Sequence, residues 1–273
     1  MKRLTIIIML ALAFNAGAQD MKIISFNIRY NSYNNIDGEN GWPYRKAAVV
    51  KMIKEENPAA IGLQEALIDQ LQYLDSCLSN YRRIGVGRDD GKVEGEFMAI
   101  YYDTSRLQLL DCSTRWLSET SKIPSKGWDA ACYRTVTIAR FRDRKSSKEF
   151  DYLNTHLDHM GKTARAEGAK LIANLVGGYE AREVPVIVGG DMNSTIDDTI
   201  FQAFYNVGMK VAREQTRHSS FVDTYTGYGK DKSSLIDHFF VREVKVKRFR
   251  TLNGDYGVPY ISDHYPIEIV IRL

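Results

Sequence analysis

The stretch Ser262-Asp263-His264-Tyr265-Pro266 leads directly into an apolar run at residues 267–271. An Asp-His pair at the entrance to a predicted strand places a carboxylate beside an imidazole. Taken alone, the pair is weak evidence for a site, because Asp is an ordinary turn residue and most such pairs have no catalytic role. Its meaning depends on the other polar residues that adjoin apolar runs.

Five further polar groups adjoin short apolar runs of β type. They are Ser25-Phe26-Asn27, Leu63-Gln64-Glu65, Asn154-Thr155-His156-Leu157-Asp158, Gly189-Gly190-Asp191-Met192-Asn193 and Ile236-Asp237-His238. Each group follows or closes a run that reads as a strand. Polar residues placed repeatedly at strand ends predict one shared site.

In this order, the six groups resemble the endonuclease/exonuclease/phosphatase superfamily, which includes pancreatic deoxyribonuclease and the inositol polyphosphate 5-phosphatases. The resemblance extends from about residue 21 to residue 273, and its specificity comes from the full ordered set. It implies an α/β fold, a four-layer α/β sandwich in which two packed, mainly antiparallel sheets are flanked by helices. The alternation of strand-like and helical segments also favours two packed sheets covered by helices.

Periodicity predicts the individual elements. Helices are expected at 44–56, 67–78, 163–179 and near 199–207. Strands are expected at 21–30, 58–64, 81–86, 98–102, 107–114, 133–140, 149–155, 184–188, 235–241, 244–252 and 267–271. No Pro/Ser/Gly-rich linker, charge block or internal repeat divides residues 19–273, which we therefore expect to form a single catalytic domain.

Residues 1–18 have the pattern of a secretory signal peptide. Lys2-Arg3 precede an apolar run at 4–14, and Ala16-Gly17-Ala18 provide small residues for cleavage. An uncleaved anchor or a buried helix is the alternative. The run is shorter than the roughly 20 residues of a membrane-spanning helix. We expect an exported protein, periplasmic or extracellular, without stable membrane insertion.

Without Lys2 and Arg3, the 37 basic residues fall to 35 against 34 acidic ones. A near-neutral surface argues against tight, sequence-independent binding of a long duplex, which depends on many phosphate contacts. It leaves open a nuclease with a local basic groove. The candidate patch, for which a solvated strand edge is the alternative, comprises Arg242, Lys245, Lys247, Arg248 and Arg250.

The three cysteines, Cys77, Cys112 and Cys132, allow at most one disulfide. Sequence separation favours a Cys112–Cys132 pair, and three buried thiols are the alternative. No zinc-type Cys/His spacing occurs in the sequence. Any metal ion is therefore expected to be bound through oxygen.

Hydrolysis of a phosphate ester needs a cation, an oriented water and a group that assists the departing oxygen. Glu65 is the best candidate metal ligand, and Asn27 either supplies a second oxygen or orients that carboxylate. Asp263 is expected to assist the metal ion or the water. Few protein oxygens with retained waters suit Mg²⁺, and Mn²⁺ fits the same ligands.

The resemblance implies roles for the remaining polar residues. Asp191 would orient or deprotonate the attacking water, and Asn193 would donate a hydrogen bond in the transition state. Asp237 would fix and charge His264 against the scissile phosphate. Without the resemblance, Gly-Gly-Asp-Met-Asn reads as a turn with an Asx cap.

His156 matches the histidine on the leaving-group side, where general acid is its most economical role. Arg134 is a candidate phosphate clamp, and Asp158 is a second candidate substrate-binding residue; a surface position is the alternative for Arg134. His159 either belongs to the site or caps a loop. For His238, packing is favoured over a role in the site.

These residues together predict a secreted hydrolase of phosphate esters that depends on Mg²⁺ or Mn²⁺. A phosphodiesterase or nuclease is favoured, and its substrates would include nucleic acid. The alternative is a lipid or sugar-phosphate phosphatase or phosphodiesterase on the same scaffold, acting on a phosphomonoester or a phosphodiester. A non-enzymatic binding module is disfavoured, because the sequence lacks none of the expected metal-binding or water-activating residues.

Overall fold

The computed structural model describes residues 19–178 and 184–273. The predicted signal peptide, residues 1–18, and Tyr179 of the predicted third helix lie outside these ranges. Within them, seven strands form one sheet: β1 (Met21–Asn27), β2 (Ala60–Gln64), β3 (Tyr81–Ile84), β4 (Ile100–Asp103), β10 (Ser219–Ser220), β12 (Lys245–Thr251) and β13 (Ile267–Arg272). Their order across the sheet is β10-β12-β13-β1-β2-β4-β3.

The second sheet, in the same described residues, has six strands. They are β5 (Leu107–Trp116), β6 (Thr135–Asp143), β7 (Glu149–His156), β8 (Val186–Asp191), β9 (Lys210–Val211) and β11 (Asp237–Arg242), in the order β5-β6-β7-β8-β11-β9. The pairs β1–β2, β7–β8 and β10–β12 are parallel, and the other pairs are antiparallel. The predicted mainly antiparallel sheets are confirmed.

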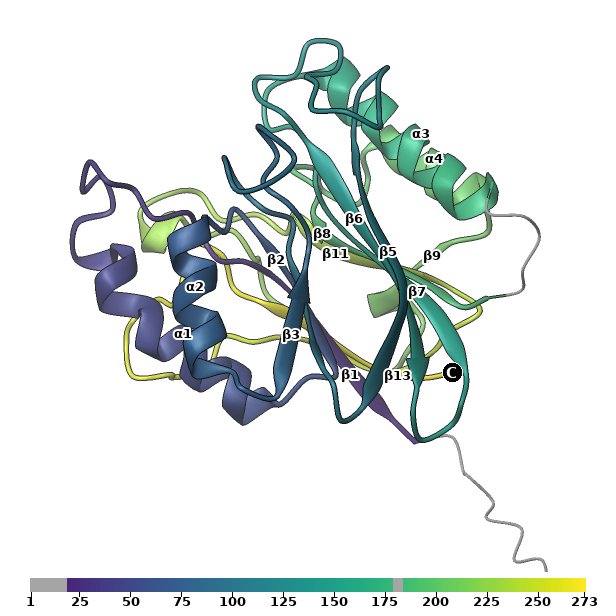
Figure 1. The fold of residues 1–273 in the computed structure, drawn as a ribbon, viewed down its shortest axis with the longest axis horizontal. Helices are drawn as coiled ribbons and strands as arrows, with labels where there is room; N and C mark the ends of the chain where they lie inside the picture. Colours follow the sequence, from purple (N-terminus) through teal and green to yellow (C-terminus); the bar gives the residue numbers. More distant parts are fainter. Residues whose placement is uncertain (1–18, 179–183) are drawn as a thin grey trace, which may run out of the picture.

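The helices cover the outer faces of the two sheets. Helices α1 (Trp42–Glu56) and α2 (Ile68–Cys77) lie together against the seven-stranded sheet, and α3 (Lys162–Gly178) and α4 (Gln202–Asn206) lie on the opposite side of the molecule (Figure 1). Short 3₁₀ helices occupy Gly38–Asn40, Thr199–Phe201, Ala212–Glu214 and Gly227–Gly229. The predicted helix near 199–207 is thus a 3₁₀ turn followed by one short α-helix.

Apolar clusters fill the spaces between the layers. Along β1, Ile23 packs between the sheets and Ile24 packs toward α1, because successive side chains of a strand point to opposite faces. In β11, Phe239 likewise lies between the sheets, whereas Phe240 packs toward α3 and α4. Burial on both faces explains why these strands read as apolar runs. The four-layer α/β sandwich predicted from the sequence is confirmed.

Two further observations concern the cysteines and the helices of the described residues. Cys77, Cys112 and Cys132 all lie within the described ranges and carry free thiols, so the Cys112–Cys132 pair is not formed. In residues 19–178 and 184–273, no helix has the length and apolar character needed to cross a bilayer.

Candidate active site

The strand register brings the predicted polar residues to one edge of the sandwich. Asn27 pairs with Gln64 across the parallel strands β1 and β2, which places Glu65 beside Asn27. In the second sheet, Asp191 pairs with His156 on one side and with Asp237 on the other. Carboxyl ends of parallel strands therefore supply residues from both sheets to the same edge.

A cavity of about 440 Å³ opens at this edge. Seven of the ten predicted site residues line it: Glu65, Arg134, His156, Asp191, Asn193, Asp263 and His264. The other three, Asn27, Asp158 and Asp237, are buried behind its wall and form hydrogen bonds to residues that line it. The structure thus assembles all ten residues around one cavity.

Backbone geometry at the strand ends directs the side chains into the cavity. Glu65 and Asn193 adopt φ values of 62° and 48°. Left-handed conformations are costly for residues other than glycine and persist where the surrounding structure holds them in place. A Cβ atom on Gly190 would lie 1.9 Å from the carbonyl oxygen of Thr155, so the second glycine before Asp191 permits the close approach of β7 and β8.

Asp191 is the centre of the hydrogen-bond network. The amide of Asn27 lies 3.0 Å from Asp191 Oδ2 and 3.0 Å from Glu65 Oε1, and donates to both. The backbone N–H of Asn193 donates to Asp191 Oδ1 over 2.9 Å. Burial, reinforced by the negative charge of Asp237, raises the pKa of Asp191 to about 7. Asn27 therefore acts as a bridge between two carboxylates, which is one of its two expected roles.

His264 is paired with Asp237. Its Nδ1 lies 2.8 Å from Asp237 Oδ2, and its Nε2 lies 3.7 Å from Asp191 Oδ2. Burial alone would lower the pKa of His264, but Asp237 and Asp191 outweigh burial and raise the pKa to about 10. His264 is therefore a buried imidazolium at neutral pH.

His156 has the opposite protonation state to His264. Its Nε2 lies 2.9 Å from Asn193 Nδ2 and 3.4 Å from Asp191 Oδ2, and among the described residues its buried Nδ1 has no hydrogen-bond partner. Burial, followed by the charges of Arg134 and Arg88, lowers the pKa of His156 well below its ordinary value. This imidazole is neutral near pH 7, which does not favour the general-acid role expected from the sequence.

Arg134 is held by two neighbours. Its Nε donates to Asp158 Oδ2 over 3.1 Å, and its Nη2 lies 2.8 Å from His159 Nδ1. Burial would raise the pKa of Asp158, but the backbone N–H groups of Gly161, Ala131 and Met160, together with the charge of Arg134, outweigh burial and lower the pKa to about 2. Asp158 therefore positions Arg134 and does not itself face the cavity.

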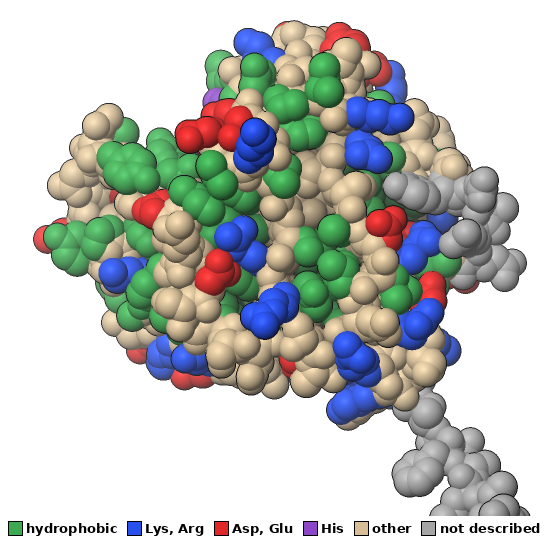
Figure 2. All heavy atoms as spheres, viewed as in Figure 1, with side chains coloured by type: hydrophobic (Ala, Val, Ile, Leu, Met, Phe, Trp, Pro, Cys, Tyr) green, Lys and Arg blue, Asp and Glu red, His purple; other side chains and the backbone are tan. Residues whose placement is uncertain are grey.

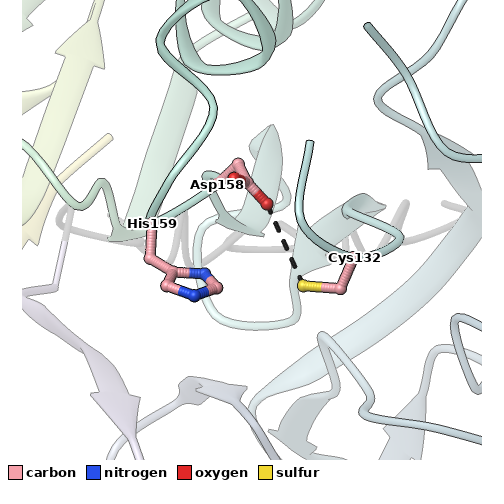
Figure 3. Close-up of side chains that lie close together, drawn as sticks. All are labelled: Cys132, Asp158 and His159. Carbon is pink, nitrogen blue, oxygen red and sulfur yellow. Dashed lines mark hydrogen bonds between the residues drawn. The ribbon is translucent and has the colours of Figure 1, made fainter. Parts of the chain in front are cut away.

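Asp158, His159 and Cys132 lie close together, as Figure 3 shows, with ligand-type atoms within 4.8 Å of one another. Distance alone would allow a metal ion in this group. However, Arg134 donates to Asp158 Oδ2, the oxygen that also lies near Cys132 Sγ, and Arg134 contacts His159. The guanidinium therefore occupies the place that a metal ion would take in this group. We interpret the group as a cradle for Arg134.

Sequence reasoning missed three charged residues of the cavity: Arg29, Arg88 and Glu96. Arg88 binds Glu96 through two hydrogen bonds of 2.6 and 2.9 Å. Burial raises the pKa of Glu96 to about 7, against the opposing charge of Arg88. Both residues come from a Gly-rich segment at 87–96. The charged residues of this segment are the feature of the sequence that could have indicated a role in the site. Arg29 follows Asn27 by two positions, which was a signal of the same kind.

His238 lies outside the cavity. Its Nε2 lies 2.9 Å from the carbonyl oxygen of Ser194, and its ring packs edge-on against Phe201. Burial lowers the pKa of His238 to about 4. The packing role favoured from the sequence is therefore the one the structure shows.

Comparisons with known proteins identify the family and the fold of the chain. The model of the Endonuclease/Exonuclease/phosphatase family matches residues 24–264. A solved endonuclease/exonuclease/phosphatase from Bacteroides vulgatus is 34% identical, with a TM-score of 0.87 and coverage of 93% of this chain and 99% of that one. The mannosyl-6-phosphatase of Bacteroides thetaiotaomicron is 31% identical, with a TM-score of 0.86 and coverage of 92% and 99%.

An uncharacterised protein of Acanthamoeba polyphaga mimivirus is 24% identical over an alignment 271 residues long, which covers 92% of this chain and all of that one. The family match spans most of the chain. It includes all ten site residues, from Asn27 to His264, which is the last residue matched. The chain belongs to the endonuclease/exonuclease/phosphatase family.

Proposed function

We propose that residues 19–273 form one catalytic domain, a divalent-metal-dependent phosphoesterase that hydrolyses a small phosphorylated molecule, in the first instance a sugar phosphate. The observation that carries the proposal is the convergence of Glu65, His156, Asp191 and His264 on one cavity. Members of the family are phosphoesterases or nucleases.

The donor set of the cavity fits a hard cation. Glu65 and Asp263 present carboxylate oxygens to the cavity, and Mg²⁺ and Mn²⁺ prefer oxygen ligands. A second group, Asp191, Asp237 and His264, also has ligand atoms within 4.8 Å. In that group His264 is already an imidazolium bonded to Asp237, so we assign the metal ion to Glu65 and Asp263, with Asn27 orienting Glu65. When bound, the ion would neutralise charge on the phosphate.

The protein's own groups supply the rest of the chemistry. Asp191 orients the attacking water and accepts its proton, and a base whose pKa lies near 7 suits this task. The imidazolium of His264 stabilises negative charge on the phosphate and donates its proton to the oxygen that departs when the P–O bond breaks. The amide of Asn193 donates to neutral His156 Nε2 and to the carbonyl oxygen of Leu157, so these two side chains form a fixed wall of the cavity beside Asp191.

The distribution of charge supports a small substrate. Figure 2 shows Lys and Arg side chains interspersed with Asp and Glu on the face displayed. In the candidate basic patch, Arg248 and Arg250 bind the buried carboxylate of Glu268, so they are not free for a nucleic acid backbone. The likeness to a mannosyl-6-phosphatase over 92% of this chain adds support for a sugar phosphate.

A phosphodiester, including a nucleic acid, is the second candidate substrate. Tyr30 and Tyr225 line the cavity, and aromatic faces of this kind stack on bases as well as on sugars. The lipid and non-enzymatic alternatives have no comparable observation in their favour.

The test is a substrate screen with purified protein and Mg²⁺ or Mn²⁺. We would compare a hexose 6-phosphate, p-nitrophenyl phosphate, bis(p-nitrophenyl) phosphate, RNA, and single- and double-stranded DNA, each with and without EDTA. We expect hydrolysis of the monoesters, abolished by EDTA. Faster hydrolysis of the diesters would select the second candidate, and activity that resists EDTA would contradict metal dependence.

We also propose export to the periplasm or the extracellular space, on the basis of the pattern at residues 1–18. Fractionation of cells expressing the full chain, followed by amino-terminal sequencing of the product, tests this. Intracellular protein that retains residues 1–18 would contradict it.

A further inference from the structure

We propose that Arg29 is a phosphate-binding cation next to the carboxylates assigned to the metal ion. Its guanidinium contacts the substrate phosphate beside the metal ion, and its charge limits the carboxylates around it to a single divalent ion. This inference rests on the proposed function and assigns a role that the sequence did not indicate.

The backbone of Arg29 is held on both sides. Its N–H donates to Asn27 Oδ1 over 3.0 Å. Its carbonyl oxygen accepts hydrogen bonds from Arg45 Nη2 over 2.6 Å and from Gln70 Nε2 over 3.0 Å. Both donors are buried, and Arg29 itself has a φ of 56°. The left-handed conformation therefore persists because neighbouring groups enforce it, and it turns the side chain back toward the cavity.

The side chain is held as firmly as the backbone. Asp37 accepts from Nε over 3.3 Å and from Nη2 over 3.1 Å, and the guanidinium lies 4.3 Å from the centroid of the Tyr30 ring. It remains 20% exposed and lines the 440 Å³ cavity. An arginine fixed in this way meets a phosphate with little further loss of conformational freedom.

The guanidinium stands between the two carboxylates assigned to the metal ion. Nη1 lies 3.9 Å from Glu65 Oε2, and Nε lies 3.9 Å from Asp263 Oδ2. At these distances the charge of Arg29 reduces the affinity of both carboxylates for a divalent ion. It also offers planar N–H donors to any phosphate that lies next to an ion on Glu65. Arg29 thus lowers the affinity of the site for the metal ion and raises its affinity for the phosphate.

In Arg29→Met, the affinity for the metal ion and the affinity for phosphate should therefore change in opposite directions. By isothermal titration calorimetry, we expect the wild-type protein to bind one Mn²⁺ and the variant to bind Mn²⁺ about tenfold more tightly. Affinity of the Mn²⁺-loaded variant for inorganic phosphate should fall by about tenfold, and turnover should fall with it. A role limited to folding would weaken both kinds of binding together.

Arg140→Met is the matched control. Arg140 also binds an aspartate through two hydrogen bonds, of 2.8 and 2.9 Å to Asp151, and is 17% exposed, but it does not line the cavity. Its Mn²⁺ and phosphate affinities should equal those of the wild type. If Arg140→Met changed the Mn²⁺ and phosphate affinities as much as Arg29→Met does, the proposal would be overturned, because the effect would not depend on the position of Arg29 in the cavity.

Two wild-type Mn²⁺ ions per chain, or Mn²⁺ affinity in Arg29→Met that is unchanged or weaker, would also overturn it. If Arg29→Met does not fold by circular dichroism, Arg29→Lys replaces it. This variant keeps the charge, so we expect Mn²⁺ affinity near that of the wild type and weaker phosphate binding; undiminished phosphate binding would contradict the proposal. If no phosphoester is hydrolysed, the proposed function fails, whereas both titrations still decide the role of Arg29.

Discussion

At the scale of single residues, two buried histidines in one cavity carry opposite charge states. His264 has a carboxylate at 2.8 Å and is held as a cation, whereas His156 faces an amide and two arginines and is held neutral. Burial acts on both in the same direction, so the neighbouring charges decide the difference. The cationic histidine is therefore the better proton donor, although both positions hold the same amino acid.

Asp191→Asn is expected to reduce turnover by at least about 10³-fold while leaving the fold intact, because the amide cannot accept a proton from water. Steady-state kinetics with the best substrate of the screen, together with a thermal melt, would measure both effects. Asp197→Asn, an exposed aspartate near the same strand end, is the control and should retain full activity. Substantial turnover by Asp191→Asn would remove Asp191 from the role of base.

His238 predicts a pH dependence of stability. Its pKa is about 4 in the folded protein and about 6.5 when unfolded, so the unfolded chain binds more protons between these values. The contribution of His238 to the free energy of unfolding is therefore fully present above about pH 6.5, and it falls by up to about 3 kcal/mol as the pH decreases toward 4.

His238→Phe removes this titration. At pH 7 the variant should be less stable than the wild type by about 1 kcal/mol, because the carbonyl of Ser194 loses its partner. The gap should close or reverse at pH 4.5. Urea denaturation at both pH values provides the measurement, and a gap that does not change with pH would contradict the argument.

At the scale of elements, a single buried arginine joins a helix to two active-site segments. Arg45 on α1 donates to the carbonyl oxygens of Ile28, Arg29, Asn40 and Ile261. The first two follow Asn27 at the end of β1, and Ile261 precedes Ser262-Asp263-His264. The position of α1 thus sets the separation of the two loops that supply Arg29 and Asp263.

Arg45→Met is expected to lower the free energy of unfolding by about 3 kcal/mol, because it leaves buried carbonyl groups without donors. Arg45→Lys should recover part of the loss. Denaturation in urea measures both variants against Lys51→Met, an exposed position on the same helix. A loss below about 1 kcal/mol in Arg45→Met would show that water replaces the guanidinium.

At the scale of the whole molecule, the catalytic geometry depends on the packing of one sheet on the other. Asn154 on β7 crosses the space between the sheets and donates to the carbonyl oxygens of Leu63 and Ala99, each over 2.9 Å. Its Oδ1 accepts from Gln64 Nε2 over 2.6 Å. The residue after Gln64 is Glu65, and His156 lies two positions after Asn154, so this contact ties the two halves of the site together.

Asn154→Ala is expected to destabilise the protein by about 3 kcal/mol and to lower kcat/KM at temperatures where the variant remains folded. Asn174→Ala, on the exposed face of α3, should change stability by less than about 0.5 kcal/mol. Urea denaturation and steady-state kinetics at 15 °C would test both. Unchanged kcat/KM in folded Asn154→Ala would mean that other interlayer contacts suffice to set the spacing.

Much of this architecture was predictable from local patterns. Apolar runs located the strands, since strands buried on both faces must be apolar, and the ordered polar groups at their ends located Asn27, Glu65, His156, Asp191 and His264. Boundaries were less predictable. The first strand was expected to extend to residue 30 but ends at Asn27, because Arg29 adopts a left-handed conformation that its buried neighbours enforce.

The sequence by itself determined the family resemblance, the α/β sandwich that this resemblance implies, and seven of the residues that line the cavity, because strand periodicity and strand-end polarity are local properties. Only the tertiary structure decided that His156 is neutral, that Asp158 supports Arg134 from behind, and that Arg29 enters the cavity. Those properties depend on burial and on charges a few ångströms apart in space that come from distant parts of the chain. No local pattern contains such distances.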